Sequence, residues 1–385
     1  MVPIPPSTTS KYHLFEHGVK TWRARMGGVI RADLDQLPSY VPGRSIPGAV
    51  KLASNEVAAA PPPNVIAAIR DAAAGVNRYP SNTAPALLDR LGARLNVPTS
   101  QVAVGPGSVA LCEQLVQATC RPADEVVFAW RSFEAYPIIT QVVGAGRRMV
   151  PLRGDHTHDL PAMLAAISPR TRLVFVCNPN NPTGTAVSRK ELVAFLDAVP
   201  DGVLIVLDEA YYEFVTDPAV ADGVALSRDC DNLAVLRTFS KAYRLAGLRV
   251  GYCVAPEPVV AALRKVSVPF SVNSVAQAAA LASIDVADEL LAHCRQVTAE
   301  RDRVRAELLA MGYAVPDSQA NFIWLPLGQR SDAFNDHCRA HKIVIRPFSA
   351  DGVRVTIGNP QENDLFLSAA HDWPPTSRKR RQPPM

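Results

Sequence analysis

The sequence predicts an α/β protein, with a large domain built on a mainly parallel sheet flanked by helices and a smaller α+β domain. Short, continuously apolar runs alternate with longer Ala- and Leu-rich stretches, which is typical of strands buried on both faces of a parallel sheet. After Pro269 the order changes to a long helical stretch followed by several short strands, which is typical of an α+β unit.

We place the domain limits from the order of these strand-like and helical stretches and from the positions of the prolines. Pro47 and the Pro61–Pro63 run indicate an extended arm rather than a helix. We predict an N-terminal extension (1–30), an N-terminal arm (31–60), a large domain (61–268), a small domain (269–373) and a basic Pro-rich tail (374–385). The expected strands are 102–104, 125–129, 173–177, 203–207, 233–236 and 250–254 in the large domain, and 321–325, 342–346 and 353–357 in the small one.

The distribution of charge argues against nucleic-acid binding by the folded part of the chain. The chain has 385 residues, 48% of them apolar, and a net charge of +4. The tail cations Arg378, Lys379, Arg380 and Arg381 equal that whole excess, so the remaining chain is neutral. A folded nucleic-acid-binding surface carries a clustered basic excess instead. We interpret the tail as a solvated end, with contact to a polyanion or an anionic membrane as the alternative.

Several features favour a cytoplasmic protein without a membrane span. No apolar run approaches the roughly 18 residues of a spanning helix, and residues 1–10 lack the apolar core of a signal peptide. The seven cysteines are odd in number and include no C-x-x-C pair, which indicates scattered thiols. His337 and His341 stand four apart without an acidic third ligand, so no metal site is predicted.

A lysine and a carboxylate follow two of the expected strands. Lys241 comes five residues after the strand 233–236, and Asp208 directly follows the strand 203–207. Open α/β sheets bind ligands at the carboxyl ends of their strands. Taken singly, Lys241 is a surface cation or a Schiff-base nucleophile, and Asp208 is a helix cap or a ligand carboxylate. Together they fit pyridoxal phosphate, which needs a lysine for its aldehyde and a carboxylate for its protonated ring nitrogen.

Amide side chains follow a third expected strand, 173–177. Residues 177–184 read CNPNNPTG, a rigid turn that exposes asparagine side chains. The segment is either an ordinary turn or a source of donors. An Asn amide and the phenol of Tyr211 are suitable donors to a phenolate oxygen such as O3′ of the cofactor.

A glycine-rich turn predicts a phosphate site. Gly105-Pro106-Gly107-Ser108 follows the strand 102–104 and precedes a helical run, so backbone N–H groups can approach an anion at a helix N-terminus. The same residues fit a dinucleotide fingerprint, but the acidic pair Asp124-Glu125 precedes the next strand, whereas ribose recognition needs an acid after it. Arg249, eight residues beyond Lys241, is a candidate cation for the same phosphate.

Two arginines in the small domain are candidates for binding an acidic substrate. Arg346 and Arg354 bracket residues 347–353, and arginine binds carboxylates with two parallel hydrogen bonds. Taken separately, each of them is better explained as an ordinary surface residue.

These motifs together resemble the fold type I pyridoxal-phosphate aminotransferases, in the histidinol-phosphate aminotransferase branch. The motifs that carry the resemblance are NPNNPTG (178–184), DEAY (208–211) and TFSK (238–241) followed by Arg249. KLASNE (51–56), NRYP (77–80), WRSFE (130–134), VLRTFSKAY (235–243) and SQANFIWLPLG (318–328) are similar to the actinobacterial aromatic amino acid aminotransferases. The likeness covers about residues 31–373.

The resemblance implies a role for each matching residue. Lys241 is the catalytic Schiff-base lysine, and Asp208 partners the pyridine nitrogen. The other implied cofactor-binding residues are Asn181 and Tyr211 at the 3′-oxygen, Phe133 stacked on the ring, Gly107, Ser108, Ser240 and Arg249 at the phosphate, and Tyr79 reaching the phosphate from the other subunit. Arg354 binds the α-carboxylate, and the distal part of the substrate pocket is lined by Tyr40, Asn55 and Arg346.

The implied enzyme is a homodimeric transaminase with small-molecule substrates. It converts aromatic L-amino acids and 2-oxoglutarate to aromatic 2-oxo acids and L-glutamate by a ping-pong mechanism. The alternative is histidinol-phosphate aminotransferase, because Arg354, Arg346 and Tyr40 suit a phosphate as well as a carboxylate. One departure from the family pattern is Arg244 in the position usually held by glycine. We expect this arginine to point away from the cofactor, the alternative being added charge near the phosphate.

Overall fold

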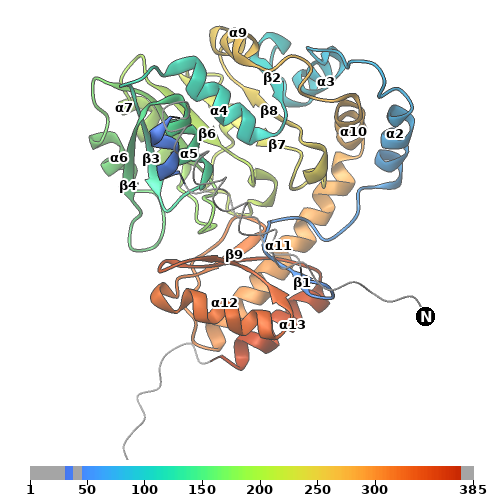
Figure 1. The fold of residues 1–385 in the computed structure, drawn as a ribbon, viewed down its shortest axis with the longest axis vertical. Helices are drawn as coiled ribbons and strands as arrows, with labels where there is room; N and C mark the ends of the chain where they lie inside the picture. Colours follow the sequence, from blue (N-terminus) through green and yellow to red (C-terminus); the bar gives the residue numbers. More distant parts are fainter. Residues whose placement is uncertain (1–30, 38–45, 374–385) are drawn as a thin grey trace, which may run out of the picture. The chain divides into compact units, whose positions relative to one another are not determined.

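A computed structural model describes residues 31–37 and 46–373 (Figure 1). The chain divides into two compact units, residues 1–42 and 43–385. The described part of the first unit holds one short 3-10 helix, η1 (Ala32–Gln36). Tyr40, the extension 1–30 and the tail 374–385 lie outside the described residues. Every helix within the described ranges is too short or too polar to cross a membrane.

The central sheet of the second unit confirms the predicted mainly parallel architecture. Its strand order is β2-β8-β7-β6-β5-β3-β4, with β4, β3, β5, β6 and β7 parallel, and with β8 antiparallel to both β7 and β2. The strands are β2 (Val102–Gly105), β3 (Glu125–Trp130), β4 (Gly146–Pro151), β5 (Thr171–Cys177), β6 (Leu204–Asp208), β7 (Leu233–Thr238) and β8 (Gly251–Val254).

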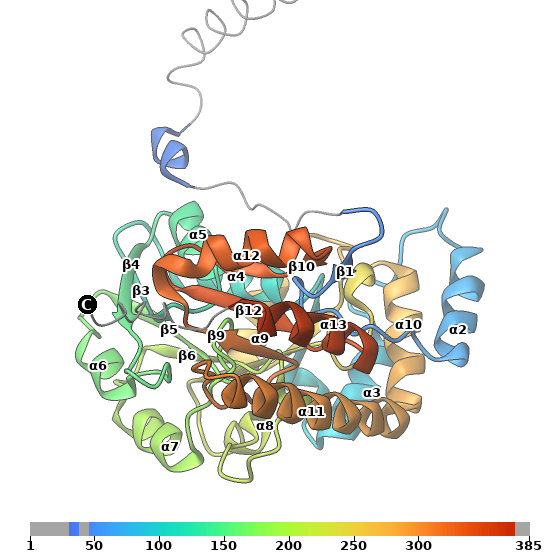
Figure 2. The same cartoon turned by 90° about the horizontal axis from the view of Figure 1, so that it is seen from below.

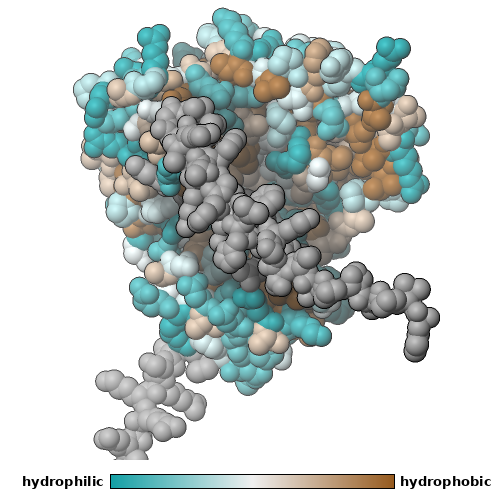
Figure 3. All heavy atoms as spheres, in the orientation of Figure 1, coloured by the Kyte–Doolittle hydropathy of each residue, from teal (hydrophilic) through white to brown (hydrophobic). Residues whose placement is uncertain are grey.

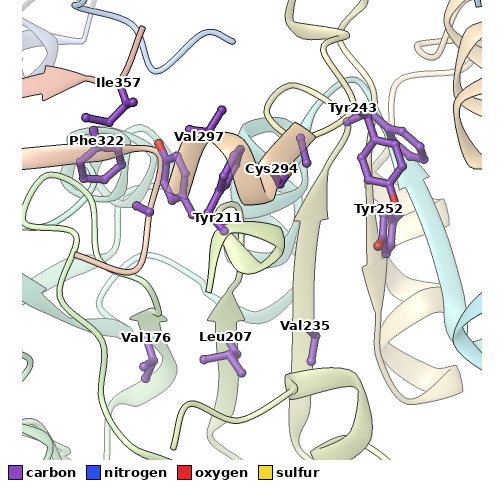
Figure 4. Close-up of a cluster of buried hydrophobic side chains, with 14 of the residues drawn as sticks. Val176, Leu207, Tyr211, Val235, Tyr243, Tyr252, Cys294, Val297, Phe322 and Ile357 are labelled. Atoms are coloured by element: carbon purple, nitrogen blue, oxygen red, sulfur yellow. The ribbon is translucent and has the colours of Figure 1, made fainter. Parts of the chain in front are cut away.

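Helices cover both faces of this sheet, so alternate side chains of each strand enter different cores. One core packs Phe128, Phe175 and Val206 against α4 (Ser108–Thr119), α5 (Ala135–Val143) and α9 (Glu257–Val266). The opposite core contains Val176, Leu207 and Val235, which lie on adjacent strands in Figure 4. The helices that add side chains to this second core include α3 (Pro85–Leu95), α6 (Leu160–Ala165), α7 (Arg189–Ala198), α8 (Gly223–Leu226), α10 (Ser274–Asp285) and α11 (Ala287–Ala310).

The predicted helical stretch after Pro269 is two helices rather than one. Val286 leaves the helical backbone, with φ −114° and ψ 24°, and α11 then begins with Asp288 and Glu289 in its first turn, where acidic side chains suit a helix N-terminus. Helix α10 packs against α2 (Pro63–Ala73) and α3, beside α2 in Figure 1. Because these are helices of the predicted large domain, we propose that the small domain begins with α11 rather than at residue 269.

The small domain combines short strands with three helices. Strands β11 (Arg346–Phe348), β12 (Gly352–Thr356) and β9 (Phe322–Leu325) form an antiparallel sheet in that order. Figure 2 shows α11, α12 (Ser331–Ala340) and α13 (Pro360–His371) on the side of these strands that faces the viewer. The strand predicted at 342–346 is divided, because β10 (Ile343–Val344) pairs in parallel with β1 (Val50–Lys51) of the arm, whereas Arg346 begins β11.

A buried arginine joins α11 to the central part of the molecule. Arg301 is 1% exposed and donates from Nη1 to Phe214 O at 3.1 Å and Ala320 O at 3.3 Å, and from Nη2 to Thr216 Oγ1 at 3.0 Å. These acceptors lie in two loops far apart in the sequence, so one guanidinium connects both of them to the helix.

We expect Arg301→Ala to lower the free energy of unfolding by about 3 kcal/mol, because each buried acceptor left unpaired costs on the order of 1–3 kcal/mol. Urea unfolding followed by helical circular dichroism measures this change. Arg303→Ala is the matched control on the same helix. Its ion pairs with Glu300 and Asp364 are solvent-exposed and should contribute at most about 1 kcal/mol. Equal effects of the two variants would contradict the assignment.

Candidate active site

Three parallel strands end in polar residues at one edge of the central sheet. Cys177 is the last residue of β5 and Asp208 the last residue of β6, and the two are register partners. Lys241 follows β7 by three residues. The structure therefore brings Asn181, Asp208, Tyr211 and Lys241 to the same edge, as the strand pattern predicts.

The Asp208 carboxylate is buried and bound by neutral donors. Tyr136 of α5 donates its hydroxyl to Oδ2 at 2.7 Å, and the Ala210 N–H donates to Oδ1 at 3.2 Å. Asp208 is 3% exposed, and burial raises the pKa of its carboxyl above the ordinary value. Neither of these partners is a cation, so a positively charged group of a ligand would stabilise the ionised form.

The Lys241 amine lies in an environment that favours its neutral form. Nζ donates to Ser54 O at 3.2 Å and lies 5.8 Å from the centre of the Tyr211 ring. Burial, together with the positive charges of Arg354 and Arg249, lowers the pKa of Lys241 to about 7, and the Glu56 carboxylate acts in the opposite direction. A lysine with a pKa near neutrality is a nucleophile and a proton acceptor at physiological pH.

Asn55 connects Tyr211 to the small domain. Its Nδ2 donates to the Tyr211 hydroxyl at 2.9 Å, its backbone N–H donates to Thr356 Oγ1 at 2.9 Å, and its carbonyl accepts from Asn321 Nδ2 at 3.2 Å. Because Tyr211 accepts the bond from Asn55, its own O–H proton remains a donor. Figure 4 shows the Tyr211 and Phe322 rings close together, and their centroids lie 5.0 Å apart.

Asn181 and Arg354 form a second connection between the two sheets. Arg354 is 8% exposed and donates from Nη1 to Asn181 Oδ1 and from Nη2 to Ala53 O, each at 2.6 Å. With its oxygen facing the guanidinium, the Asn181 amide presents its N–H donors to other groups. Asn55–Tyr211 and Asn181–Arg354 are thus two buried hydrogen-bonded pairs, and Tyr211 and Arg354 both lie near Lys241.

The glycine-rich turn and the segment after β7 lie together at the start of α4. Gly107, with φ +89°, precedes α4, and a Cβ at this position would lie 2.5 Å from Arg249 Nη2. Arg249 Nη1 donates to Ser240 Oγ at 3.3 Å. The structure therefore groups Gly107, Ser240 and Arg249 at the N-terminus of α4, where Ser108 is the first helical residue and the first N–H groups lack intrahelical partners.

The unusual arginine after the lysine segment makes its own contact. Arg244 is partly buried and donates from Nη1 to Ala60 O at 2.8 Å, and burial lowers its pKa. This bond directs the guanidinium to the end of the arm, which supports the interpretation that it points away from the phosphate site.

The remaining described candidates make other contacts, and the structure does not bring Tyr79 to the other candidates. Phe133 is partly buried, and its ring meets that of Tyr136 edge-on at 5.5 Å. Arg346 donates from Nη2 to Glu134 Oε2 at 2.9 Å. Tyr79 is 82% exposed and stacks on Phe270 at 4.7 Å, at the surface of the subunit.

Four residues that the sequence did not single out contact the predicted ones. Tyr136 stands three positions after Phe133, a helical spacing that could have indicated it. Thr356, Asn321 and Glu134 carry no such local signal, because their partners are 301, 266 and 212 positions away in the chain.

The sequence matches a known enzyme family. Residues 47–369 match the family model for aminotransferase class I and II. The chain therefore belongs to the class I and II aminotransferases.

Two relatives in the family are closely similar over most of their length. The aromatic amino acid aminotransferase of Rhodococcus jostii (strain RHA1) is 59% identical over 340 residues, which are 88% of this chain and 94% of the relative. The aromatic amino acid aminotransferase of Streptomyces coelicolor is 53% identical over 348 residues, or 89% of this chain and 97% of the relative.

A solved structure has the same fold. The crystal structure of histidinol-phosphate aminotransferase from Sinorhizobium meliloti, in complex with pyridoxal-5′-phosphate, matches with a TM-score of 0.82 and 29% identity. The match covers 89% of this chain and 96% of that one. The prediction of a fold type I α/β architecture is confirmed.

In the ligand-free protein, we expect the Lys241 amine to react with acetic anhydride half-maximally near pH 7, because only the neutral amine reacts and its pKa is about 7. An ordinary lysine titrates near about 10.4. Mass spectrometry of peptides measures the reaction at each lysine. Arg354→Gln should raise the midpoint and Glu56→Gln should lower it, since these charges act in opposite directions on Lys241. A midpoint near 10 in the parent protein would refute the environment described.

Proposed function

We propose that this protein is a pyridoxal-phosphate-dependent aminotransferase that transfers the amino group of aromatic L-amino acids to 2-oxoglutarate. The name shared by relatives that are 53–59% identical supports this substrate class. The structural observation that carries the proposal is an aromatic face of the small sheet. Phe322, Trp324 and Phe348 lie on the face that also presents Arg354 to Asn181, so an acid-binding group stands among aromatic rings.

The residues present fit pyridoxal phosphate. The cradle of Gly107, Ser108, Ser240 and Arg249 suits a phosphate, and a side chain at position 107 would fill it. The buried Asp208 carboxylate, bound by a phenol and a backbone N–H, suits the protonated ring nitrogen. Asn181 and Tyr211 have donors for the ring oxygen, and Phe133 lies next to Tyr136 on the segment that would cover the ring.

When bound, pyridoxal phosphate supplies an aldehyde that bonds amines and a ring that withdraws electrons from the substrate α-carbon. Lys241 would hold the aldehyde, and its amine would accept the proton of the substrate α-carbon when it is not bonded to that aldehyde. Its low pKa would let the amine accept that proton near neutral pH. Asp208 would hold the protonated ring nitrogen, and Arg354 would orient the substrate through its α-carboxylate. Amino acid and 2-oxoglutarate react in turn at the same site, so ping-pong kinetics follow.

The distal side chain of the substrate would meet Asn55, Arg346 and Tyr40. Asn55 is buried and holds Tyr211, and Arg346 lies beside Phe348 with its guanidinium carbon 5.8 Å from the ring centre. Tyr40 stands outside the described residues, and its role rests on the sequence resemblance alone.

We propose a homodimer in which Tyr79 binds the phosphate held by the partner subunit. The large apolar side chains exposed near this residue are Val76, Val268 and Phe270, and Tyr79 itself is more exposed than any of them. In Figure 3, apolar surface gathers in the region of α2 and α10. Exposed apolar surface of this kind is typical of an interface.

The cytoplasmic location remains a prediction from the sequence.

Lys241→Ala should lower steady-state transamination by at least about 10³-fold and remove the visible absorbance of lysine-linked cofactor, because alanine has no amine to bond the aldehyde or to accept the α-proton. The wild-type kcat/KM with phenylalanine should exceed that with histidinol phosphate. Both are measured with 2-oxoglutarate as acceptor. Retained absorbance in Lys241→Ala would contradict the assignment of Lys241 as the Schiff-base lysine. A higher kcat/KM with histidinol phosphate than with phenylalanine would identify histidinol phosphate as the preferred substrate.

Tyr79→Ala should weaken cofactor binding by about tenfold or more, the loss expected for one hydrogen bond to a charged group. Co-expression with Lys241→Ala should restore about a quarter of wild-type activity at limiting cofactor, because half of a random mixture is heterodimer with one intact site. Activity of mixed and separate variants at equal total protein measures the effect. Absence of restoration would place Tyr79 in its own subunit's site or outside both.

A further inference from the structure

A carboxylate lies opposite Arg346 at the edge of the proposed substrate pocket. Glu134 directly follows Phe133 and is the N-cap residue of α5, but its side chain makes no hydrogen bond to that helix. Instead, Glu134 Oε2 accepts from Arg346 Nη2 at 2.9 Å, across 212 positions of sequence. The side chain therefore serves an interaction with β11 rather than helix capping.

Strand geometry places Arg346 on the aromatic face. Arg346 and Arg354 are register partners in the antiparallel pair β11–β12, and Trp324 of β9 is the register partner of Arg354. Register partners project from the same face of a sheet. Their guanidinium carbons lie 5.8 Å and 5.9 Å from the centre of the Phe348 ring, so both arginines flank one aromatic side chain.

The two arginines have described acceptors of different charge. Arg354 donates to the amide oxygen of Asn181 and to a backbone carbonyl, which are neutral acceptors. Arg346 donates to a carboxylate, and the pair is partly shielded from water, with the Arg346 side chain 16% exposed and that of Glu134 34%. A charge-assisted hydrogen bond in such a place offsets much of the positive charge that Arg346 would otherwise present to a substrate.

This pairing discriminates between substrate side chains by charge. A phosphate dianion that approached Arg346 would also approach the Glu134 carboxylate, and like charges brought together at a binding site are strongly unfavourable. An uncharged aromatic side chain meets no such repulsion and contacts Phe348 and its neighbours.

We propose that Glu134 determines substrate specificity by neutralising Arg346, so that the distal pocket favours uncharged aromatic side chains over phosphorylated ones. This inference rests on the proposed function. The side-chain carboxylate of 2-oxoglutarate binds by competing with Glu134 for Arg346, at a cost smaller than that for a dianion.

Glu134→Gln tests the proposal, because it removes the charge and keeps the shape of the side chain. In the cofactor-loaded enzyme, kcat/KM for histidinol phosphate should rise at least about tenfold, mainly through KM, while the value for phenylalanine changes less than about threefold. Calorimetric binding should show the same split, with glutarate binding about tenfold more tightly and 3-phenylpropionate nearly unchanged.

Asp351→Asn is the matched control. Asp351 pairs with Arg131, whose guanidinium carbon lies 5.6 Å from the same Phe348 ring, but the Asp351 side chain is 43% exposed. This variant should leave the ratio of the two kcat/KM values unchanged. The double variant Glu134→Gln/Arg346→Gln should lose the gain in glutarate binding, since that gain depends on the arginine.

Two results would overturn the inference: an unchanged ratio in Glu134→Gln, or an equal change in Asp351→Asn. Failure of the proposed function is a separate observation, since it would appear in the wild-type enzyme as a preference for histidinol phosphate over phenylalanine. Thermal melting of each variant checks that the fold is retained, and glutarate binding by the folded protein reports on the pair independently of turnover.

Discussion

The arm segment 52–56 is the constraint on which the site depends, because it is hydrogen-bonded to both sheets at once. Leu52 donates to Val344 O at 2.7 Å and accepts from the Thr356 N–H at 2.9 Å, which ties the segment to the small domain. Two residues further on, Ser54 O accepts from Lys241, and Asn55 donates to Tyr211. Backbone groups that cannot reach water must find partners, so this segment holds its position and orients the groups around it.

Charge is placed sparingly around this segment, and each buried charge has a defined partner. Arg354 bonds Asn181 and Ala53, Arg346 bonds Glu134, and Asp208 bonds Tyr136. The Lys241 amine donates to Ser54 O, and burial and neighbouring arginines favour its neutral form. The same low-dielectric surroundings that make an unpaired ion costly therefore produce the reactive amine.

Much of the architecture is predictable from the sequence, for a physical reason that also explains what was missed. Strands β3, β5, β6 and β7 are buried on both faces and so appear as continuous apolar runs. The edge strand β4 was not predicted, because Gly146–Pro151 is exposed at five of its six positions and has no apolar pattern. The division of 342–346 into β10 and β11 depends on which strand each half pairs with. The partner strands are distant in the sequence, so the local residue pattern does not predict this division.

The sequence by itself determined the central sheet and the chemistry placed at its edge, because parallel strands end together and Lys241, Asp208 and Asn181 each follow one of them. Tertiary structure alone decided the partners of these groups. Tyr136 reaches Asp208 across 72 positions, Glu134 reaches Arg346 across 212, and Asn55 reaches Thr356 across 301. Contacts of this kind form when helices and strands pack, and hydrogen-bond geometry and burial at those contacts set the charge of each group.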